Sequence, residues 1–147
     1  MYPTPAVTAL IDEQFLPVRI HVKEQPRMWR RFRVRWTPTV MVLSPDGAEV
    51  RRTEGYLPAD ELRGQLLLGL GYVAANAKDW ATAERWFAQA AEERETDAGP
   101  EGLYWVGVSR YSASHDADAL PATSAAFAER YQDTSWAKRA SIWAPGG

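Results

Sequence analysis

The chain has 147 residues, of which 46% are hydrophobic and seven are tryptophan, enough to bury a core in one domain or in two small ones. It contains no cysteine, which excludes disulfides, catalysis by a thiolate and zinc sites built on sulfur. Residues 1–68 carry ten Lys/Arg against eight Asp/Glu, and residues 69–147 carry seven against eleven. Neither half is charged enough to require a nucleic acid or an acidic lipid surface as partner.

No apolar stretch is long enough to span a bilayer, because the longest, around residues 66–73, is short and broken by glycines. Residues 1–5 have neither the basic nor the apolar region of a secretory signal. We therefore expect a cytoplasmic protein with no membrane-spanning segment.

The first elements that the sequence predicts are a helix and a strand. Thr4 offers a hydroxyl cap, and Pro5 suits the first helical position. The apolar residues that follow at helical spacing are Val7, Leu10, Ile11 and Phe15. Residues 18–22 then alternate between apolar and polar, which is the period of a half-exposed strand with Arg19 and His21 facing outward.

Residues 27–35 combine five arginines with large apolar side chains. Met28, Trp29 and Phe32 fall at helical spacing, which favours a short amphipathic helix whose arginines are solvated. The alternative is a nucleic-acid patch, since arginines beside stacking aromatics suit phosphate and base contacts. No nucleic-acid-binding motif accompanies the stretch and the whole chain is acidic, so we expect no nucleic-acid partner.

A Thr-Pro-Thr sequence centred on Pro38 precedes the wholly apolar run of residues 40–43. Proline is tolerated where a strand begins, because its missing N–H costs no ladder bond there. The run therefore predicts a strand buried on both faces. Residues 44–47 read Ser-Pro-Asp-Gly, a turn sequence, so residues 50–56 are predicted to return as the antiparallel partner.

From residue 58 onward the sequence predicts helices only. Pro58, with two acidic residues after it, opens a helix in which Gly69 and Gly71 mark either the end or the close approach of a neighbour. The polar residues 95–102 predict a loop and a hinge. The other helices expected are those of residues 79–91, 103–111 and 120–131, and a last one capped by residues 133–135.

The ordered elements from about residue 7 to residue 71 resemble the second half of a thioredoxin-like domain, where a cis proline precedes a central strand and a hairpin leads into the last helix. The resemblance implies an α/β fold, an incomplete thioredoxin-like sheet with cis-Pro38 before a central strand. It also implies that the backbone of Trp36, Thr37 and Pro38 pairs with an extended stretch of a peptide. The alternative is that Pro38 only begins a strand. The redox Cys-x-x-Cys of the family has no counterpart in this chain.

Residues 72–147 resemble a tetratricopeptide-like helical extension, built of C-terminal α-helical hairpins. Ala83, Phe87 and Ala90 match the small–large–small positions of the second helix of such a repeat, although the spacing is too irregular for true repeats. Fewer than three such units cannot bury their faces alone, so the extension must pack on another part of the protein. We therefore divide the chain into a truncated thioredoxin-like domain, residues 1–71, and the extension, residues 72–147.

The missing first strand of the family lies between the strands equivalent to residues 18–22 and 39–43. Without it, each of these strands would have an unpaired edge. The two strands can pair directly, a second copy can fill the gap, or the chain can be a piece of a longer protein. We favour a two-fold homodimer through the unpaired strands, since one contact would satisfy both edges.

Candidates for catalysis are few. The histidines are His21 and His115, and the consecutive Ser114, His115 and Asp116 cannot point at one another as a preorganised triad must. We expect no catalytic residue. Two distant histidines without cysteine make no metal site, and no glycine pattern matches a nucleotide-binding loop, so we expect no metal and no cofactor.

The sequence thus predicts a non-enzymatic binding or assembly module without redox activity, whose partner is a protein or peptide held at Trp36, Thr37 and Pro38. The alternative is a fragment of a thiol–disulfide oxidoreductase whose Cys-x-x-Cys part is missing from this chain. In that case the longer parent protein would be an enzyme.

Overall fold

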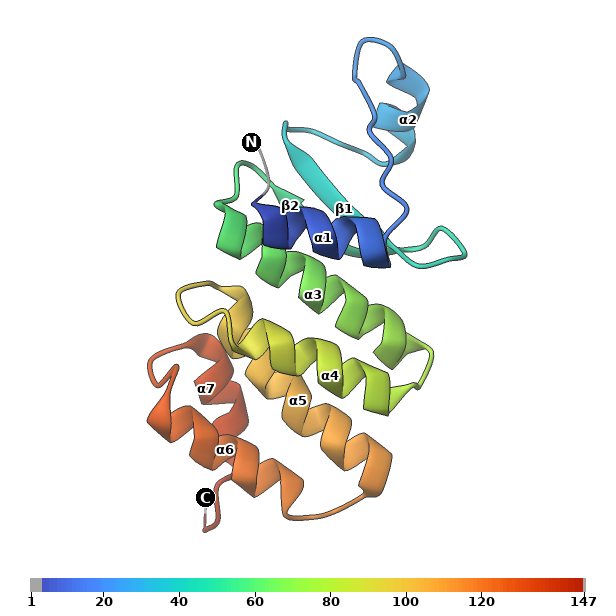
Figure 1. Ribbon diagram of the computed structural model, residues 1–147. Coiled ribbons are helices and arrows are strands. Elements are labelled where there is room, and N and C mark those ends of the chain that lie inside the picture. Colours follow the sequence, from blue (N-terminus) through green and yellow to red (C-terminus); the bar gives the residue numbers. More distant parts are fainter. Residues whose placement is uncertain (1–3, 147) are drawn as a thin grey trace.

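The protein is described by a computed structural model that covers residues 4–146. Two antiparallel strands and the first two helices lie at one end, and the helices after the hairpin follow in successive layers (Figure 1). The elements are α1 (Pro5–Gln14), α2 (Pro26–Arg31), β1 (Thr39–Leu43), β2 (Glu49–Glu54), α3 (Ala59–Asn76), α4 (Trp80–Ala91), α5 (Ala98–Ser114), α6 (Ala119–Glu129), α7 (Ser135–Ala140) and the 3-10 turn η1 (Ser141–Trp143). The fold is mainly helical with one small sheet. No helix within residues 4–146 combines the length and the hydropathy needed to cross a bilayer.

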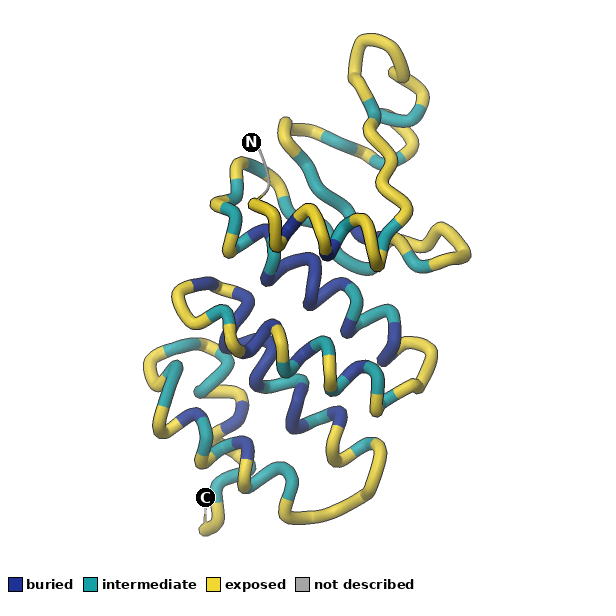
Figure 2. Tube along the Cα trace, viewed as in Figure 1, coloured by how far each residue is buried: buried dark blue, intermediate teal, exposed yellow. Residues whose placement is uncertain are grey.

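Burial is concentrated in the middle of the helical stack, in α3, α4 and α5 (Figure 2). The segment before β1, which includes α2, contains only exposed and half-buried residues from residue 11 to residue 41. The hairpin end of the molecule is therefore its least covered part.

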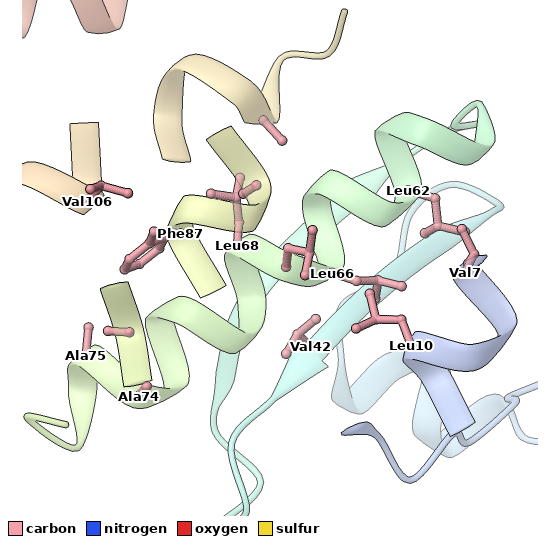
Figure 3. Close-up of a cluster of buried hydrophobic side chains, with 14 residues drawn as sticks. Val7, Leu10, Val42, Leu62, Leu66, Leu68, Ala74, Ala75, Phe87 and Val106 are labelled. Carbon is pink, nitrogen blue, oxygen red and sulfur yellow. The ribbon is translucent and has the colours of Figure 1, made fainter. Parts of the chain in front are cut away.

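The core joins α1, β1 and α3. The Thr4 hydroxyl accepts a hydrogen bond from the Val7 N–H at 3.4 Å, so the helix begins as the sequence predicts. Val7 and Leu10 then point into one buried cluster with Leu62 of α3, to which Val42 of β1 also belongs (Figure 3). Burial of these apolar side chains fixes α1 and the hairpin on α3.

Helix α3 continues past both of its central glycines. A Cβ atom at Gly69 would lie 2.6 Å from Cγ2 of Val42, and one at Gly71 would lie 2.5 Å from the ring of Phe87. Both glycines therefore mark close approaches of neighbours and not the end of the helix. The predicted boundary between residues 71 and 72 lies inside α3, and the division into two domains stays a prediction.

The predicted strand at residues 18–22 is wrong. The only sheet among the described residues consists of β1 and β2, and residues 15–21 have no regular secondary structure. A strand exists only where a ladder partner exists, and neither β1 nor any other described segment pairs with these residues. Leu16 and Val18 are consequently 91% and 75% exposed. Of the arrangements left open by the sequence, direct pairing of residues 18–22 with β1 is not the one observed.

The predicted loop at residues 95–102 is also wrong in its second half. Helix α5 begins at Ala98, and residues 98–103 are all buried. Pro100 lies in the first turn, where a missing N–H breaks no helical hydrogen bond. Gly99 fits beside the hydroxyl of Tyr131, and Gly102 lies against the backbone of α4. These packed positions leave no room for a hinge.

Candidate functional site

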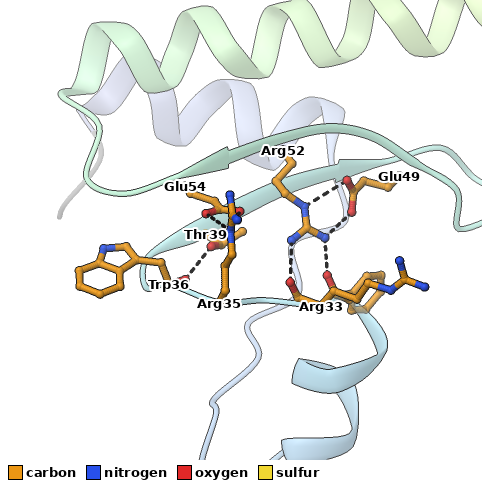
Figure 4. Close-up of polar contacts among 8 residues, drawn as sticks. Arg33, Arg35, Trp36, Thr39, Glu49, Arg52 and Glu54 are labelled. Atoms are coloured by element: carbon orange, nitrogen blue, oxygen red, sulfur yellow. Dashed lines mark hydrogen bonds and ion pairs between the residues drawn. The ribbon is translucent and has the colours of Figure 1, made fainter.

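The residues predicted to contact a peptide lie at an exposed bend just before β1. Trp36 is 66% exposed, and Thr37 and Pro38 are exposed as well. The peptide bond between Thr37 and Pro38 is cis. The hydroxyl of Thr39 donates a hydrogen bond to the Trp36 carbonyl at 2.7 Å, and the indole of Trp36 points away from the hairpin (Figure 4).

One edge of β1 pairs with no other strand among the described residues. The Gly55 N–H donates to the Pro38 carbonyl at 2.8 Å, so Pro38 directs its backbone at β2. Because neighbours in an antiparallel strand alternate, residues 40 and 42 also direct their backbone groups at β2, and the odd-numbered residues of β1, 39, 41 and 43, direct theirs away from it. No hydrogen bond joins a backbone group of these odd-numbered residues to another segment within the described part of the chain. We call these outward N–H and C=O groups the open edge.

A groove of about 1120 Å³ runs along the open edge. The segment of residues 14–22 forms its far wall. Leu70 and Val73 of α3 also line it, as do Met28, Trp29 and Phe32. The lining is therefore mostly apolar, and the wrongly predicted strand at residues 18–22 is one border of the groove.

Arg52 holds the segment after α2 on the outer face of the hairpin (Figure 4). Its guanidinium donates to the carbonyls of Phe32 and Arg33 and to both carboxylate oxygens of Glu49, with Nη2 to Oε1 at 2.6 Å. This charge-assisted pairing lowers the pKa of Glu49 and raises the pKa of Arg52. A neighbouring ion pair joins Arg35 to Glu54 at 3.1 Å.

Several cations beside the groove have no acidic partner. Within the described range, no ion pair involves Arg19, Lys23, Arg27, Arg30, Arg31 or Arg33. All of these residues are exposed. They give this end of the molecule a positive potential that favours acidic groups.

The residues considered for catalysis are not assembled into a site. The Ser114 hydroxyl donates to the Arg110 carbonyl at 2.8 Å and accepts from the Asp116 N–H at 3.1 Å. His115 ends α5 and contacts the ring of Tyr111, whereas His21 lies in the exposed segment beside the groove. Among the described residues, no group of three or more metal-binding side chains is close enough to hold an ion.

Sequence reasoning missed a buried polar cluster that joins β2, α3 and α5. Arg51 donates to Glu101 at 2.7 and 3.0 Å and to the Gln65 side-chain oxygen at 2.8 Å. The Tyr72 hydroxyl also donates to Glu101, and burial together with this carboxylate raises the pKa of Tyr72. Each member has a partner inside the cluster, so the cluster connects the hairpin with the helical stack. No local sequence pattern predicts this cluster, because its members lie far apart in sequence.

Residues 3–68 match the model of a family described as a thioredoxin-like domain. The chain therefore contains a thioredoxin-like domain, which confirms that part of the predicted resemblance. The matched range includes α1, α2, both strands and the first half of α3, and the chain has no cysteine. No match was found among curated proteins or among solved structures.

Proposed function

We propose that this protein is a binding or assembly module built on a thioredoxin-like domain and that it carries out no thiol–disulfide chemistry. The open edge of β1 is the observation that supports the proposal. Unpaired backbone groups along a strand are a template for another extended segment, which gains main-chain hydrogen bonds on binding. With no sulfur from cysteine, the domain has no atom to exchange electrons with a thiol.

Trp36, Thr37 and Pro38 form the entry to this edge in the proposal. Thr37 is exposed next to the exposed indole of Trp36, so a bound peptide could reach its backbone and pack an apolar side chain on the indole. An exposed tryptophan is a favourable anchor at such a contact because of its large apolar surface.

The same edge supports a homodimer. Two β1 strands pairing about a two-fold axis would form a sheet of four strands and satisfy both open edges together. Light scattering at several protein concentrations tests this arrangement. A mass of two chains that falls to one chain in a Met41→Pro variant supports it, because the outward N–H of residue 41 is then lost.

The helical part serves as a support in this proposal. Helices α4 to α7 would act as a tetratricopeptide-like extension that packs on α3 and keeps the hairpin in place.

The second candidate function is that of a part of a longer thiol–disulfide oxidoreductase whose Cys-x-x-Cys lies outside this chain. The groove beside β1 favours it, because the strand that precedes this motif in the family would have room there. A disulfide-reduction assay on the chain alone should stay at background under either proposal. Turnover above background would contradict both.

A further inference from the structure

Four arginines on and just after α2 form an exposed surface outside the groove. This arginine face consists of Arg27, Arg30, Arg31 and Arg33. The first three follow the spacing i, i+3, i+4, so they lie on one side of the helix. The opposite side carries Met28, Trp29 and Phe32, which line the groove, whereas no member of the arginine face lines it. An occupant of the groove therefore does not need to cover the arginine face.

The end of α2 holds Arg33 in a conformation that glycine usually takes. The Val34 N–H donates to the Trp29 carbonyl at 3.1 Å. The Arg33 N–H donates to the Arg30 carbonyl at 3.1 Å, which completes the hydrogen-bond pattern of a Schellman motif. Arg33 is the left-handed residue of this motif, with a φ of 51°, and a side chain there costs backbone strain that glycine avoids. Its own side chain is exposed and forms no ion pair with a described residue, so no ion pair within the protein explains an arginine at this position.

Arg52 fixes the arginine face on the hairpin. Its guanidinium donates to the carbonyls of Phe32 and Arg33, directly after α2 (Figure 4). Glu49 pairs with the same guanidinium, so the charge of Arg52 is compensated within the protein. The arginine face is therefore carried by a segment whose backbone is already held in place, which lowers the entropy cost of binding a partner.

The charge of this segment has the opposite sign to that of the rest of the chain. Residues 19–33 contain six basic residues against one acidic residue, Glu24, a net charge of +5, whereas the remaining residues contain eleven basic against eighteen acidic, a net charge of −7. The exposed carboxylates of Asp12 and Glu13 lie on α1, and that of Asp46 lies in the turn after β1. Both of these elements are separated from α2 in the fold (Figure 1). The positive potential is therefore strong but confined to a small region.

The size of this region limits the partner. Helix α2 has six residues and is about 9 Å long, which matches about three or four residues of an extended peptide. A long polyanion such as a nucleic acid, or an anionic membrane surface, would extend beyond the arginine face and be repelled by the acidic remainder of the chain. A short acidic segment would stay within the positive region, where each guanidinium can pair with a carboxylate through two hydrogen bonds.

We propose that the arginine face binds a short acidic segment of another protein, a run of carboxylates held by Arg27, Arg30, Arg31 and Arg33. This surface is separate from the open edge, so the inference goes beyond the proposed function and adds a second contact to it. The strained conformation of Arg33 and the attachment by Arg52 then serve to place the guanidinium groups before the partner arrives.

The test uses the full chain and a rhodamine-labelled peptide with a run of glutamates, one for each arginine of the face, between glycine and serine residues. Fluorescence anisotropy should show saturable binding of one peptide per chain, weakened about tenfold when the salt concentration rises from about 0.02 M to about 0.2 M. The same peptide with glutamine in place of glutamate should bind at least about tenfold more weakly. A labelled single-stranded oligothymidine of about 20 nucleotides should bind more weakly than the acidic peptide.

A matched pair of double variants tests the location. Arg30→Gln with Arg31→Gln should weaken binding of the acidic peptide about tenfold, because two guanidinium groups are lost. Arg94→Gln with Lys138→Gln removes the same charge at exposed positions that form no ion pair with a described residue, and should change the affinity less than about twofold. Circular dichroism establishes that both variants are folded, and the control peptides test the proposal on the unmodified chain.

Arg33→Asn separates binding from folding. Asparagine tolerates the left-handed conformation, so the melting temperature should stay about the same. Binding of the acidic peptide should weaken about threefold, because one guanidinium is lost. A melting temperature that falls while the affinity stays the same would assign Arg33 a structural role and contradict its part in the inference.

Equal binding of the glutamine peptide, or equal losses in the two double variants, would overturn the inference. Tighter binding of oligothymidine than of the acidic peptide would also overturn it and make a nucleic acid the partner. The light-scattering test of the open edge is independent of these results. A dimer that does not bind the acidic peptide keeps the assembly function and loses the arginine face, whereas a monomer that binds it keeps the arginine face and loses the dimer.

Discussion

Arg51 of β2 and Glu101 of α5 are fifty positions apart in sequence and form two hydrogen bonds, Nη1 to Oε2 at 2.7 Å and Nη2 to Oε1 at 3.0 Å. The side chain of Glu101 is 8% exposed and that of Arg51 is 25% exposed. The pair therefore connects the hairpin, which carries the open edge, to the centre of the helical stack.

Replacing Arg51 should destabilise the protein strongly. In Arg51→Met the carboxylate of Glu101 stays buried without its cation, a loss of about 3 kcal/mol in the free energy of unfolding. Arg35→Met is the control, because the Arg35 side chain is 82% exposed and its ion pair with Glu54 contributes less than about 1 kcal/mol. Urea unfolding measures both.

Adding Glu101→Gln to Arg51→Met should restore part of the lost stability, because the double variant no longer buries an unpaired charge. Equal losses for the Arg51 and Arg35 variants would show that the buried pair is no more important than the surface pair.

Gly69→Ala should weaken the attachment of β1 to α3. The added methyl group would overlap the Val42 side chain, so strand and helix must separate, at a cost of about 1–3 kcal/mol. Combining it with Val42→Ala should cost less than the sum of the two single changes, because the smaller side chain makes room. A thermal unfolding series of the two single variants and the double variant measures this coupling, and strict additivity would contradict the close approach.

Phe87→Ala should be among the most damaging changes in the helical stack. The Phe87 side chain is fully buried, and its ring centroid lies 5.2 Å from that of Tyr72 and 5.9 Å from that of Trp105. Removing it leaves a cavity, and we expect a loss of about 3–5 kcal/mol. Ile142→Ala, at a position 76% exposed, should change the free energy of unfolding by less than about 0.5 kcal/mol. Chemical denaturation measures both variants. Similar losses in the free energy of unfolding for Phe87→Ala and Ile142→Ala would contradict the burial of Phe87 in this core.

Stability should fall in acid, partly through Glu49. Arg52 holds the pKa of Glu49 below its ordinary value in the folded protein, so the contribution of this group is complete above that ordinary value. It is lost as the pH falls below about 4 and passes through the lowered pKa. The melting temperature of Glu49→Gln should therefore depend less on pH between about pH 5 and pH 3 than that of the parent chain. If the melting temperatures of the two proteins change equally with pH, Glu49 does not contribute to the loss of stability in acid.

Local signals were sufficient for much of the fold. The cap at Thr4, the turn at residues 44–47 and the cap at Thr134 each act within a few residues, so α1, the hairpin and α7 could be predicted from neighbouring side chains. The alternation of residues 18–22 misled the prediction, because the same pattern in a segment without a partner stays irregular.

The peptide contact at Trp36, Thr37 and Pro38 stays a prediction. Trp36, Thr37 and Pro38 lie where an extended peptide can reach them. The groove itself could not be predicted, because its borders come from residues 14–22, from β1 and from α3, which meet only in the folded chain. The loop predicted at residues 95–102 was wrong in its second half for a related reason. Polar residues with glycine and proline are typical of a loop, and the sequence does not show that Glu101 pairs with Arg51 inside the fold.

By itself the sequence determined that a proline-bounded hairpin forms, because a turn depends on adjacent residues. It also determined that no cysteine is present for redox chemistry, because composition is read directly from the sequence. Only the tertiary structure decided that β1 keeps an open edge, that an apolar groove lies beside it and that Arg51 reaches α5. Pairing and burial depend on which segments meet in space, and spacing along the chain does not specify that.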